Sequence, residues 1–561
     1  MGGGEGRARV ISGLNFNPKI AYFSMEIFVD PDIHTYSGGL GMLAGDTMRT
    51  FADLNIPVVA VTLLSEKGYL RQRIVEDRQV EEEDEFDPSE KMLLIAKEIM
   101  LNIRGEDVKV RPWCYFVKGI SGYSLPVIFL DTNVKGNSDW ARELTSYLYG
   151  GDPDYRLAQE IVLRIGGFRI LKELNFSSIY RFHMNEGHAS FLTLELYRKT
   201  RNIDFVRRQC VFTTHTPVKA GHDSFSIEKV EEFLGYGIPE DILPYVTDNG
   251  NLNMTKLGMF FSHYINGVAK KHKEISSMLF PHYSIDSITN GVHSLTWVSE
   301  PFKRLFDRYM PGWRQDPYIL RSASGIPSNE VWHAHMEAKK ALIDYINNNF
   351  GKGFSHDLFT IGFARRMTAY KRPYLLFYDE DRLREIARSV NGLQIVYSGK
   401  AHPKDEEGKR IIERVIRAGR RLEPDVRFIF IPNYDFRIAK LMVSGVDLWL
   451  NTPRIPMEAS GTSGMKAAHN GVPQLSTLDG WWKEGYIEGV TGWAIGEEDQ
   501  ESDDQRDSRD LYDMLEYRIL PIFYKFRERW IEIMKNCIAL NASFFNTQRM
   551  VEQYVLNAYF L

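Results

Sequence analysis

Apolar residues in the first 300 positions gather in short unbroken runs. The runs predict strands over Lys19–Ile27, Ile56–Leu64, Val108–Val117, Leu125–Asp131, Ile179–Met184 and Val211–Thr214. Longer helical patterns cover Asp154–Leu174 and Met254–Leu279. Because unbroken apolar runs are typical of strands that helices cover on both faces, this part is predicted to be an α/β lobe.

A polar, glycine-rich segment, Asn347–His356, is the expected linker to a second lobe. Beyond it, strands and helices alternate regularly. We predict strands over Phe359–Ala364, Leu393–Ser398, Val426–Pro432, Asp447–Asn451 and Gln474–Leu478, and helices over Pro373–Ser389, Glu406–Leu422, Phe436–Val443 and Thr462–His469. Repeated βα units of this length predict a parallel, Rossmann-like sheet.

Three regions follow from this pattern. We expect an N-terminal lobe over residues 1–350, a Rossmann-like lobe over 351–535, and a C-terminal helix over 536–561 that packs back towards the N-terminal lobe. The whole tail 505–561 has helical periodicity, and the acidic stretch Glu497–Asp510 is expected to be a solvated loop.

Composition narrows the class of protein. The 561 residues suggest roughly four domains of ordinary size, or two large lobes. Lys plus Arg number 69 and Asp plus Glu 74, so the net charge of −5 argues against a nucleic-acid binder with a basic face. The three cysteines have no metal-ligand spacing, the first residues contain no apolar export signal, and no apolar run is long enough to span a membrane. We therefore expect a cytoplasmic protein.

Two segments carry candidate anion sites in the cleft between the lobes. The first, Tyr36–Asp46, has glycines at positions 38, 39 and 41 just before a predicted helix. These glycines fit two alternatives equally well, a phosphate or sugar site and a tight turn that only needs their φ angles. Arg365, Arg366, Lys371 and Arg372 follow the first strand of the second lobe. That position faces the cleft in such folds, so we favour anion binding over a solvated basic turn.

A third segment, Pro453–Gly471, combines a carboxylate with a glycine-rich helix start. Glu458 lies in the loop, Gly461 to Gly464 open the helix, and Lys466 lies just inside it. The lysine suits a phosphate ligand, a surface residue or an amine that forms a Schiff base, and sequence physics leaves the three open.

Histidines follow several predicted strands, but no metal-binding pattern accompanies them. We favour a structural role for His183 and His188 and a cleft role for His215 and His263. His293, in the run TNGVH, is a further histidine of this set and is assigned no role. Trp481 and Trp482 suit sugar stacking or the core equally well.

Taken together, these motifs resemble the α-glucan phosphorylases, the family of glycogen and maltodextrin phosphorylases. The matching runs, in order, are YSGGLG, YRLAQE, NEGH, FTTHTP, SHYINGVAKKH, TNGVH, RRMTAYKR, EASGTSGMKAAHNG and LDGWW. The resemblance implies a GT-B fold of two Rossmann-like lobes with the active site in the cleft, and pyridoxal 5′-phosphate as cofactor. The implied reaction is reversible, retaining phosphorolysis of a terminal α-1,4 glucosyl unit by inorganic phosphate to give α-glucose 1-phosphate.

Matched motif by motif, Lys466 corresponds to the lysine that forms the Schiff base with the cofactor. Roles for the other matched residues follow the family. Gly461, Thr462, Ser463 and Arg365 match residues that hold the cofactor phosphate, and Arg366 and Lys371, beside Gly39 and Leu40, match those that bind the substrate phosphate. The residues that match contacts to the glucosyl unit are His263, Asn290, Glu458, Ser460 and Gly461. Tyr434 matches a tyrosine near the cofactor. His215 and Glu26 match cleft residues without an assigned role. No metal is implied.

Ser463-Gly464 and Trp481-Trp482 depart from animal and plant members and resemble the bacterial and archaeal branch. No counterpart of the family's long regulatory N-terminal segment is visible, so we do not expect its allosteric control, and the family's homo-oligomer stays open. Two other functions remain to be distinguished. A glucan synthase of the same fold would use a nucleotide sugar without pyridoxal phosphate, and a non-catalytic protein would only bind glucan.

Overall fold

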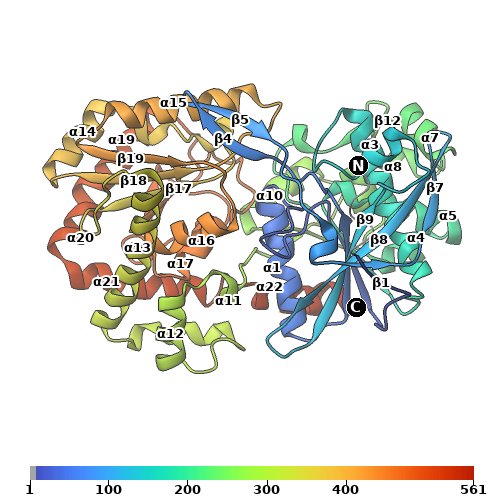
Figure 1. Cartoon of the computed structure of the whole chain (residues 1–561), viewed down its shortest axis with the longest axis horizontal. Coiled ribbons are helices and arrows are strands. Elements are labelled where there is room, and N and C mark those ends of the chain that lie inside the picture. Colours follow the sequence, from blue (N-terminus) through green and yellow to red (C-terminus); the bar gives the residue numbers. More distant parts are fainter. Residues whose placement is uncertain (1–7, 561) are drawn as a thin grey trace.

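Two large sheets, one in each of two α/β lobes, organise the chain (Figure 1). The computed structural model describes residues 8–560. Residues 1–7, most of the segment used above to argue against an export signal, lie outside the described range. Within that range, no helix is long and apolar enough to cross a bilayer.

The second-lobe sheet is parallel throughout and has the doubly wound order β19-β18-β17-β20-β21-β22. Its strands are β17 (Thr360–Ala364), β18 (Leu393–Ser398), β19 (Val426–Ile431), β20 (Leu448–Asn451), β21 (Gln474–Thr477) and β22 (Gly492–Ile495). The first five confirm the predicted strands, and β22 was not predicted. The order reverses between β17 and β20, so a crevice opens at the carboxyl ends of these two strands.

Helices cover both faces of this sheet. They include α12 (Glu300–Tyr309), α13 (Ser328–Phe350), α14 (Glu380–Ser389), α15 (Glu406–Arg421), α16 (Phe436–Gly445), α17 (Ser463–Ala468), α18 (Trp482–Gly485), α19 (Asp504–Met514), α20 (Leu520–Lys525) and α21 (Arg527–Asn536). The helix predicted from Pro373 begins only at Glu380. The Asp379 carboxylate caps it by accepting from Arg382 N, and a short 3₁₀ turn precedes it.

The predicted linker is wrong in its first part. Residues 347–350 are the last turn of α13, which ends where Gly351 takes a left-handed φ of 61°. Leu342 and Ile343 of α13 share a core with Trp449 of β20. The second lobe therefore begins before α12, near residue 294, and the boundary predicted after residue 350 is too late.

The first-lobe sheet repeats the same strand order in its parallel part, β9-β3-β2-β10-β11-β15-β16. These strands are β2 (Ile20–Phe23), β3 (Val58–Leu63), β9 (Ser124–Asp131), β10 (Arg181–Asn185), β11 (Cys210–Thr213), β15 (Tyr264–Gly267) and β16 (Asp286–Ser287). An antiparallel extension adds β8 (Glu106–Lys118), β7 (Ile99–Ile103), β6 (Leu93–Ile95) and the parallel edge β1 (Arg9–Ile11). Here β8 is buried continuously only over residues 112–114, and before them buried residues alternate with partly exposed ones, so the predicted burial of both its faces is wrong outside that middle part.

Around this sheet lie α1 (Gly39–Asp53), α3 (Pro153–Ile161), α4 (Gly167–Glu173), α5 (Phe191–Thr200), α6 (Ile203–Gln209) and α7 (Ile227–Leu234). A π-helical turn, Val162–Gly166, joins α3 to α4 in one continuous helix, which confirms the helix predicted over Asp154–Leu174. The helix predicted over Met254–Leu279 is wrong. It divides into α9 (Met254–Phe260), β15 and α10 (Lys270–Leu279), because the apolar residues of Tyr264–Gly267 are buried in the sheet instead.

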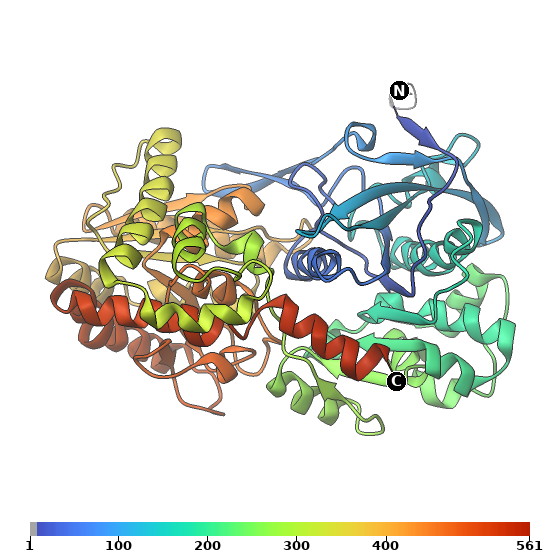
Figure 2. The same cartoon turned by 90° about the horizontal axis from the view of Figure 1, so that it is seen from below.

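Between residues 8 and 560, the chain crosses from one lobe to the other twice. The second crossing leads to α22 (Thr547–Tyr554), which extends beneath the first lobe (Figure 2). Met550 and Tyr554 of α22 share a core with Ile20 and Tyr22, and Thr547 hydrogen-bonds Thr50. The helical periodicity predicted for the tail is confirmed over these residues.

A polar hairpin also links the lobes and was not predicted. Its strands, β4 (Arg71–Val75) and β5 (Arg78–Glu82), leave the first lobe and reach α15 of the second (Figure 1). Gln72 and Gln79 are buried there and hydrogen-bond the backbone after β18. The hairpin therefore holds the two lobes together beside the cleft.

Candidate active site

A cavity of about 350 Å³ opens where the carboxyl ends of both parallel sheets meet. The first lobe contributes residues 36–40, called the glycine loop below, together with Tyr69, His215, Val268 and Asn290. The second lobe contributes the loops after β17 and β20. The structure brings together Gly39, Leu40, His215, Asn290, Arg365, Arg366, Lys371, Tyr434, Glu458, Ser460, Gly461, Thr462, Ser463 and Lys466. All residues to which the family resemblance assigned a role, except His263, thus line one cavity.

Glu26 holds the glycine loop from behind. Its buried carboxylate accepts hydrogen bonds from Ser37 N at 2.5 Å, Gly38 N at 3.3 Å and the Tyr149 hydroxyl at 2.9 Å. A side chain on Gly41 would place its Cβ 2.7 Å from this carboxylate. Glu26 therefore fixes the backbone of the loop just before α1, and the first N–H groups of this helix lie beside the cavity.

The cationic turn after β17 faces the same cavity. Arg365 and Lys371 both pair with Glu458, the latter with 2.7 Å between Nζ and Oε2. Burial raises a carboxyl pKa, but these two cations outweigh it and lower the pKa of Glu458 to about 2. Arg366 reaches across the cleft to the Ser37 hydroxyl at 3.5 Å. The turn after β17 thus places Arg365, Arg366 and Lys371 around the ionised carboxylate of Glu458.

Lys466 lies on the short helix α17, deep in the cavity. Burial lowers the pKa of its ammonium to about 8, partly offset by Asp46. Its Nζ lies 4.0 Å from the centre of the Trp297 ring, and among residues 8–560 no hydrogen-bond acceptor contacts it. Such an amine is partly neutral near physiological pH and is able to act as a nucleophile.

The loop that carries Glu458 is fixed by a second buried carboxyl. Asp479 accepts from Glu458 N at 2.8 Å and from Gly480 N at 2.9 Å. Burial, reinforced by the charge of Glu458, raises the pKa of Asp479 to about 7. Asp479 was not singled out in the sequence, although it lies in the quoted LDGWW run.

His263 is not in this cavity. Its ring nitrogens contact the carbonyls of Arg207 and Ala558, at 3.2 and 3.0 Å, at the amino end of β15, whereas the cavity lies at the carboxyl end. The other histidine of the same SHYINGVAKKH run, His272, is buried beside the cavity and accepts from the N–H of the cavity residue Val268 at 3.2 Å. The predicted placement of His263 at the glucosyl unit is therefore wrong, and the sequence analysis missed His272.

The other open questions resolve as follows. His183 is buried and hydrogen-bonds the hydroxyls of Tyr559 and Thr213, so its structural role is confirmed. His215 lines the cavity as expected, with Nε2 2.7 Å from Asn185 Oδ1. Trp481 and Trp482 are core residues, 2% and 1% exposed. Among the described residues, no three His, Cys, Asp or Glu side chains gather in a metal-binding group.

This geometry is that of a two-lobed protein whose interlobe cavity, lined by Arg365, Arg366 and Lys371, suits the binding of anionic groups. The family model of carbohydrate phosphorylases matches residues 242–484, which contain the cationic turn, Glu458 and Lys466. The chain is 38% identical to maltodextrin phosphorylase of Thermococcus litoralis over 96% of its own length and 70% of that protein. It is 36% identical to glycogen phosphorylase of Aquifex aeolicus over 97% of its own length and 86% of that protein.

An uncharacterized protein of Methanocaldococcus jannaschii is 30% identical over 96% of this chain and 99% of its own length. The chain belongs to the carbohydrate phosphorylase family. Its two Rossmann-like lobes, which face one cavity, form the GT-B fold expected from the sequence.

Proposed function

We propose that the chain is a pyridoxal 5′-phosphate-dependent α-1,4-glucan phosphorylase. It transfers the terminal glucosyl unit of glycogen or maltodextrin to inorganic phosphate, reversibly and with retention, and releases α-glucose 1-phosphate. The observation that carries the proposal is the shared cavity of Lys466, the Arg365, Arg366 and Lys371 turn, and the glycine loop.

The residues present fit the proposed cofactor. The Lys466 side chain is buried at the cavity wall and its amine has no hydrogen-bond acceptor among residues 8–560, so an aldehyde carbon is a partner that this amine could take. Arg365 Nη1 is also buried without a hydrogen-bond partner within the described range, and Nη2 of the same guanidinium would lie 3.8 Å from a Cβ on Gly461, in the turn that precedes Lys466. Arg365 and the backbone of Gly461 to Ser463 would hold the phosphate of the cofactor.

The chain's own residues supply the rest of the chemistry. Two phosphates of like charge repel each other strongly at short distance, and Arg365, Arg366 and Lys371 offset that repulsion. When bound, the cofactor supplies a phosphate that exchanges a proton with the substrate phosphate. Glu458 stays ionised at its lowered pKa, so it orients the sugar by accepting hydroxyl hydrogen bonds and does not act as an acid.

On the first-lobe side, Asn290 and the glycine loop complete the cavity. Asn290 Oδ1 is buried and has no hydrogen-bond partner in the described part of the chain, so a sugar hydroxyl is a fitting donor.

Two measurements test the proposal. Purified protein supplied with pyridoxal 5′-phosphate is expected to acquire the absorbance of the bound cofactor, and borohydride is expected to fix that cofactor covalently to Lys466. Maltodextrin and phosphate are then expected to give glucose 1-phosphate. Transfer from a nucleotide sugar without cofactor would identify a glucan synthase, and glucan binding without any product would identify a non-catalytic protein.

A further inference from the structure

Arg372 is a buried cation next to the cavity residue Lys371. Its side chain is fully buried, and it is not among the residues that line the cavity. Its backbone has a left-handed φ of 46°, which strains a residue with a side chain. A buried charge is strongly unfavourable unless it is paired and hydrogen-bonded, so its partners decide why this position holds an arginine.

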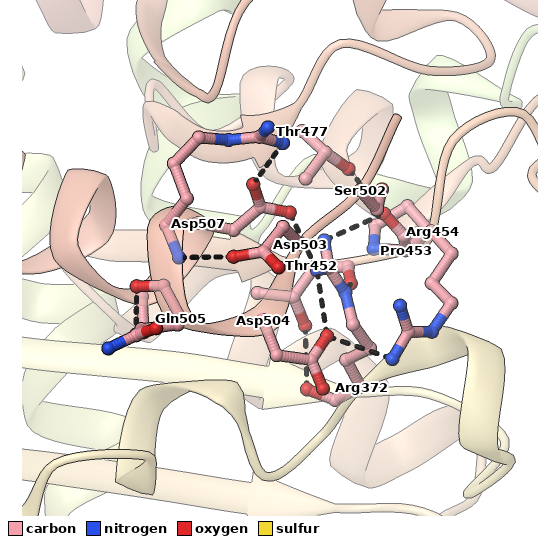
Figure 3. A network of polar contacts seen from close by, with 12 residues as sticks. Arg372, Thr452, Pro453, Arg454, Thr477, Ser502, Asp503, Asp504, Gln505 and Asp507 are labelled. Carbon is pink, nitrogen blue, oxygen red and sulfur yellow. Dashed lines mark hydrogen bonds and ion pairs between the residues drawn. The ribbon is translucent and has the colours of Figure 1, made fainter. Parts of the chain in front are cut away.

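One guanidinium joins three segments of the second lobe (Figure 3). Nη1 donates to Asp507 Oδ2 at 2.6 Å and to Asp504 Oδ1 at 3.2 Å, both at the start of α19. Nε and Nη2 donate to the carbonyls of Thr452 and Pro453, at 2.9 and 3.2 Å, just after β20. The acidic stretch predicted as a solvated loop therefore contains a buried partner, because Asp507 is only 2% exposed.

The same network returns to Lys371. The Thr452 hydroxyl lies within hydrogen-bond reach of the carbonyl oxygens of Lys371 and Arg372, at 2.8 and 3.0 Å. Thr452 also begins the loop that leads to Glu458, whose carboxylate holds the Lys371 ammonium in the cavity. The backbone of Lys371 and the base of the Glu458 loop are thus fixed to each other through Arg372.

We propose that Arg372 and Asp507 are positioning residues that set where Lys371 and Glu458 stand in the phosphate site. Because it assigns the site to phosphate, the inference rests on the proposed function. Asp507 neutralises the guanidinium from outside the cavity, and the guanidinium then draws the Thr452–Pro453 carbonyls towards the turn after β17. Without the Arg372–Asp507 pair, we expect Lys371 and Glu458 to shift relative to each other in the cavity, although both charged groups are still present.

The test compares Asp507→Asn with Asp503→Asn on the same helix. Asp503 is exposed and only caps α19, and asparagine caps a helix as well as aspartate does. We expect Asp507→Asn to raise the KM for phosphate by about tenfold, with a smaller change in kcat, because misplaced binding groups lose affinity steeply. Asp503→Asn is expected to leave both constants within about twofold.

Arg372→Lys gives a second, independent variant. A lysine keeps the charge for Asp507 but lacks the planar fork that reaches both carbonyls, so it is expected to raise the KM for phosphate as Asp507→Asn does. Thr452→Val serves the same purpose if either charge variant fails to fold.

A readout that does not depend on turnover separates the two proposals. Inorganic phosphate is expected to raise the melting temperature of the wild-type protein and of Asp503→Asn, and to raise that of Asp507→Asn and Arg372→Lys much less at equal concentration. Variants that melt at lower temperature but keep the wild-type KM and the full phosphate-induced shift would overturn the inference. Absence of glucose 1-phosphate in the wild type would instead overturn the proposed function.

Discussion

The Nζ of Lys466 lies 4.0 Å from the centre of the Trp297 ring. Among residues 8–560, no acceptor forms a hydrogen bond with this Nζ. Trp297 is itself fixed, because its indole N–H donates to Asp46 Oδ2 at 2.6 Å. The Lys466 side chain is thus buried against a fixed ring at the wall of the cavity, and this burial lowers the pKa of its ammonium.

The lowered pKa of Lys466 makes cofactor attachment dependent on pH. Only the neutral amine attacks an aldehyde, and its fraction rises with pH until it saturates above the pKa. We expect the rate of pyridoxal phosphate attachment, followed by absorbance, to rise from pH 6.5 through about 8 and then level off. Lys466→Ala should fold and attach no cofactor; a rate that keeps climbing to pH 10 would show an ordinary, solvated amine.

Arg366 lines the cavity, makes no ion pair with Glu458 and reaches towards the glycine loop. Removing it with Arg366→Ala is expected to lower kcat/KM for phosphate by about 30-fold, equivalent to about 2 kcal/mol for a charge-assisted contact. Initial rates across phosphate concentrations measure this. An unchanged phosphate dependence would contradict the role assigned to Arg366.

Glu26 offers a test of the glycine loop that separates hydrogen bonding from charge. Glu26→Ala removes the acceptor of Ser37 N and Gly38 N, so we expect the loop to loosen and the KM for phosphate to rise by about tenfold. In Glu26→Gln one amide oxygen still accepts from both N–H groups, and the KM should rise much less. Hydrogen exchange of residues 36–41 should accelerate in the alanine variant alone; equal exchange in both variants would refute this role.

Much of the second lobe could be predicted because its strands are unbroken apolar runs at regular spacing. The chemistry of the site followed from the rule that cleft residues come after parallel strands, which applies to Arg365 and to Glu458. In contrast, β15 is short and lies between two helices, so a continuous helix fitted its apolar residues equally well. Because β15 was not predicted, the sequence did not show that the histidines flanking it, His263 and His272, lie at opposite ends of a strand and at different distances from the cavity.

Other features depend on contacts between distant segments. The hairpin β4–β5 is polar and charged, and its two buried glutamines are explained only by the second lobe that they contact. Likewise, nothing local marks Asp507 as a buried partner of Arg372, 135 residues away in the sequence. Such residues look solvated until the tertiary structure is known.

Asp479 should make stability fall with rising pH. A carboxyl group with a raised pKa binds its proton more tightly in the folded protein, so its contribution to stability is complete below about pH 4 and is lost as the pH rises through about 7. The loss is at most about 4 kcal/mol. Urea unfolding between pH 4 and 8 should show this slope in the wild type, whereas Asp479→Asn should have a flatter profile; parallel profiles would exclude Asp479 as the source.

The hairpin β4–β5 makes a prediction about the coupling of the two lobes. Gln79 donates to Ala401 O at 3.0 Å and accepts from Ala401 N at 2.9 Å, and Gln72 donates to Gly399 O at 2.9 Å. Gln79→Ala leaves both Ala401 backbone groups unpaired in a buried interface, so we expect the free energy of unfolding to fall by about 1–3 kcal/mol.

The matched control on the same hairpin is Arg73→Ala, which breaks only the exposed pair with Glu82 and should cost less than about 1 kcal/mol. Because the cavity needs the glycine loop of one lobe against Arg366 of the other, Gln79→Ala should also raise the KM for phosphate, while Arg73→Ala should not. If the two variants behave alike in urea unfolding and in kinetics, the hairpin contacts the second lobe without stabilising the arrangement of the two lobes.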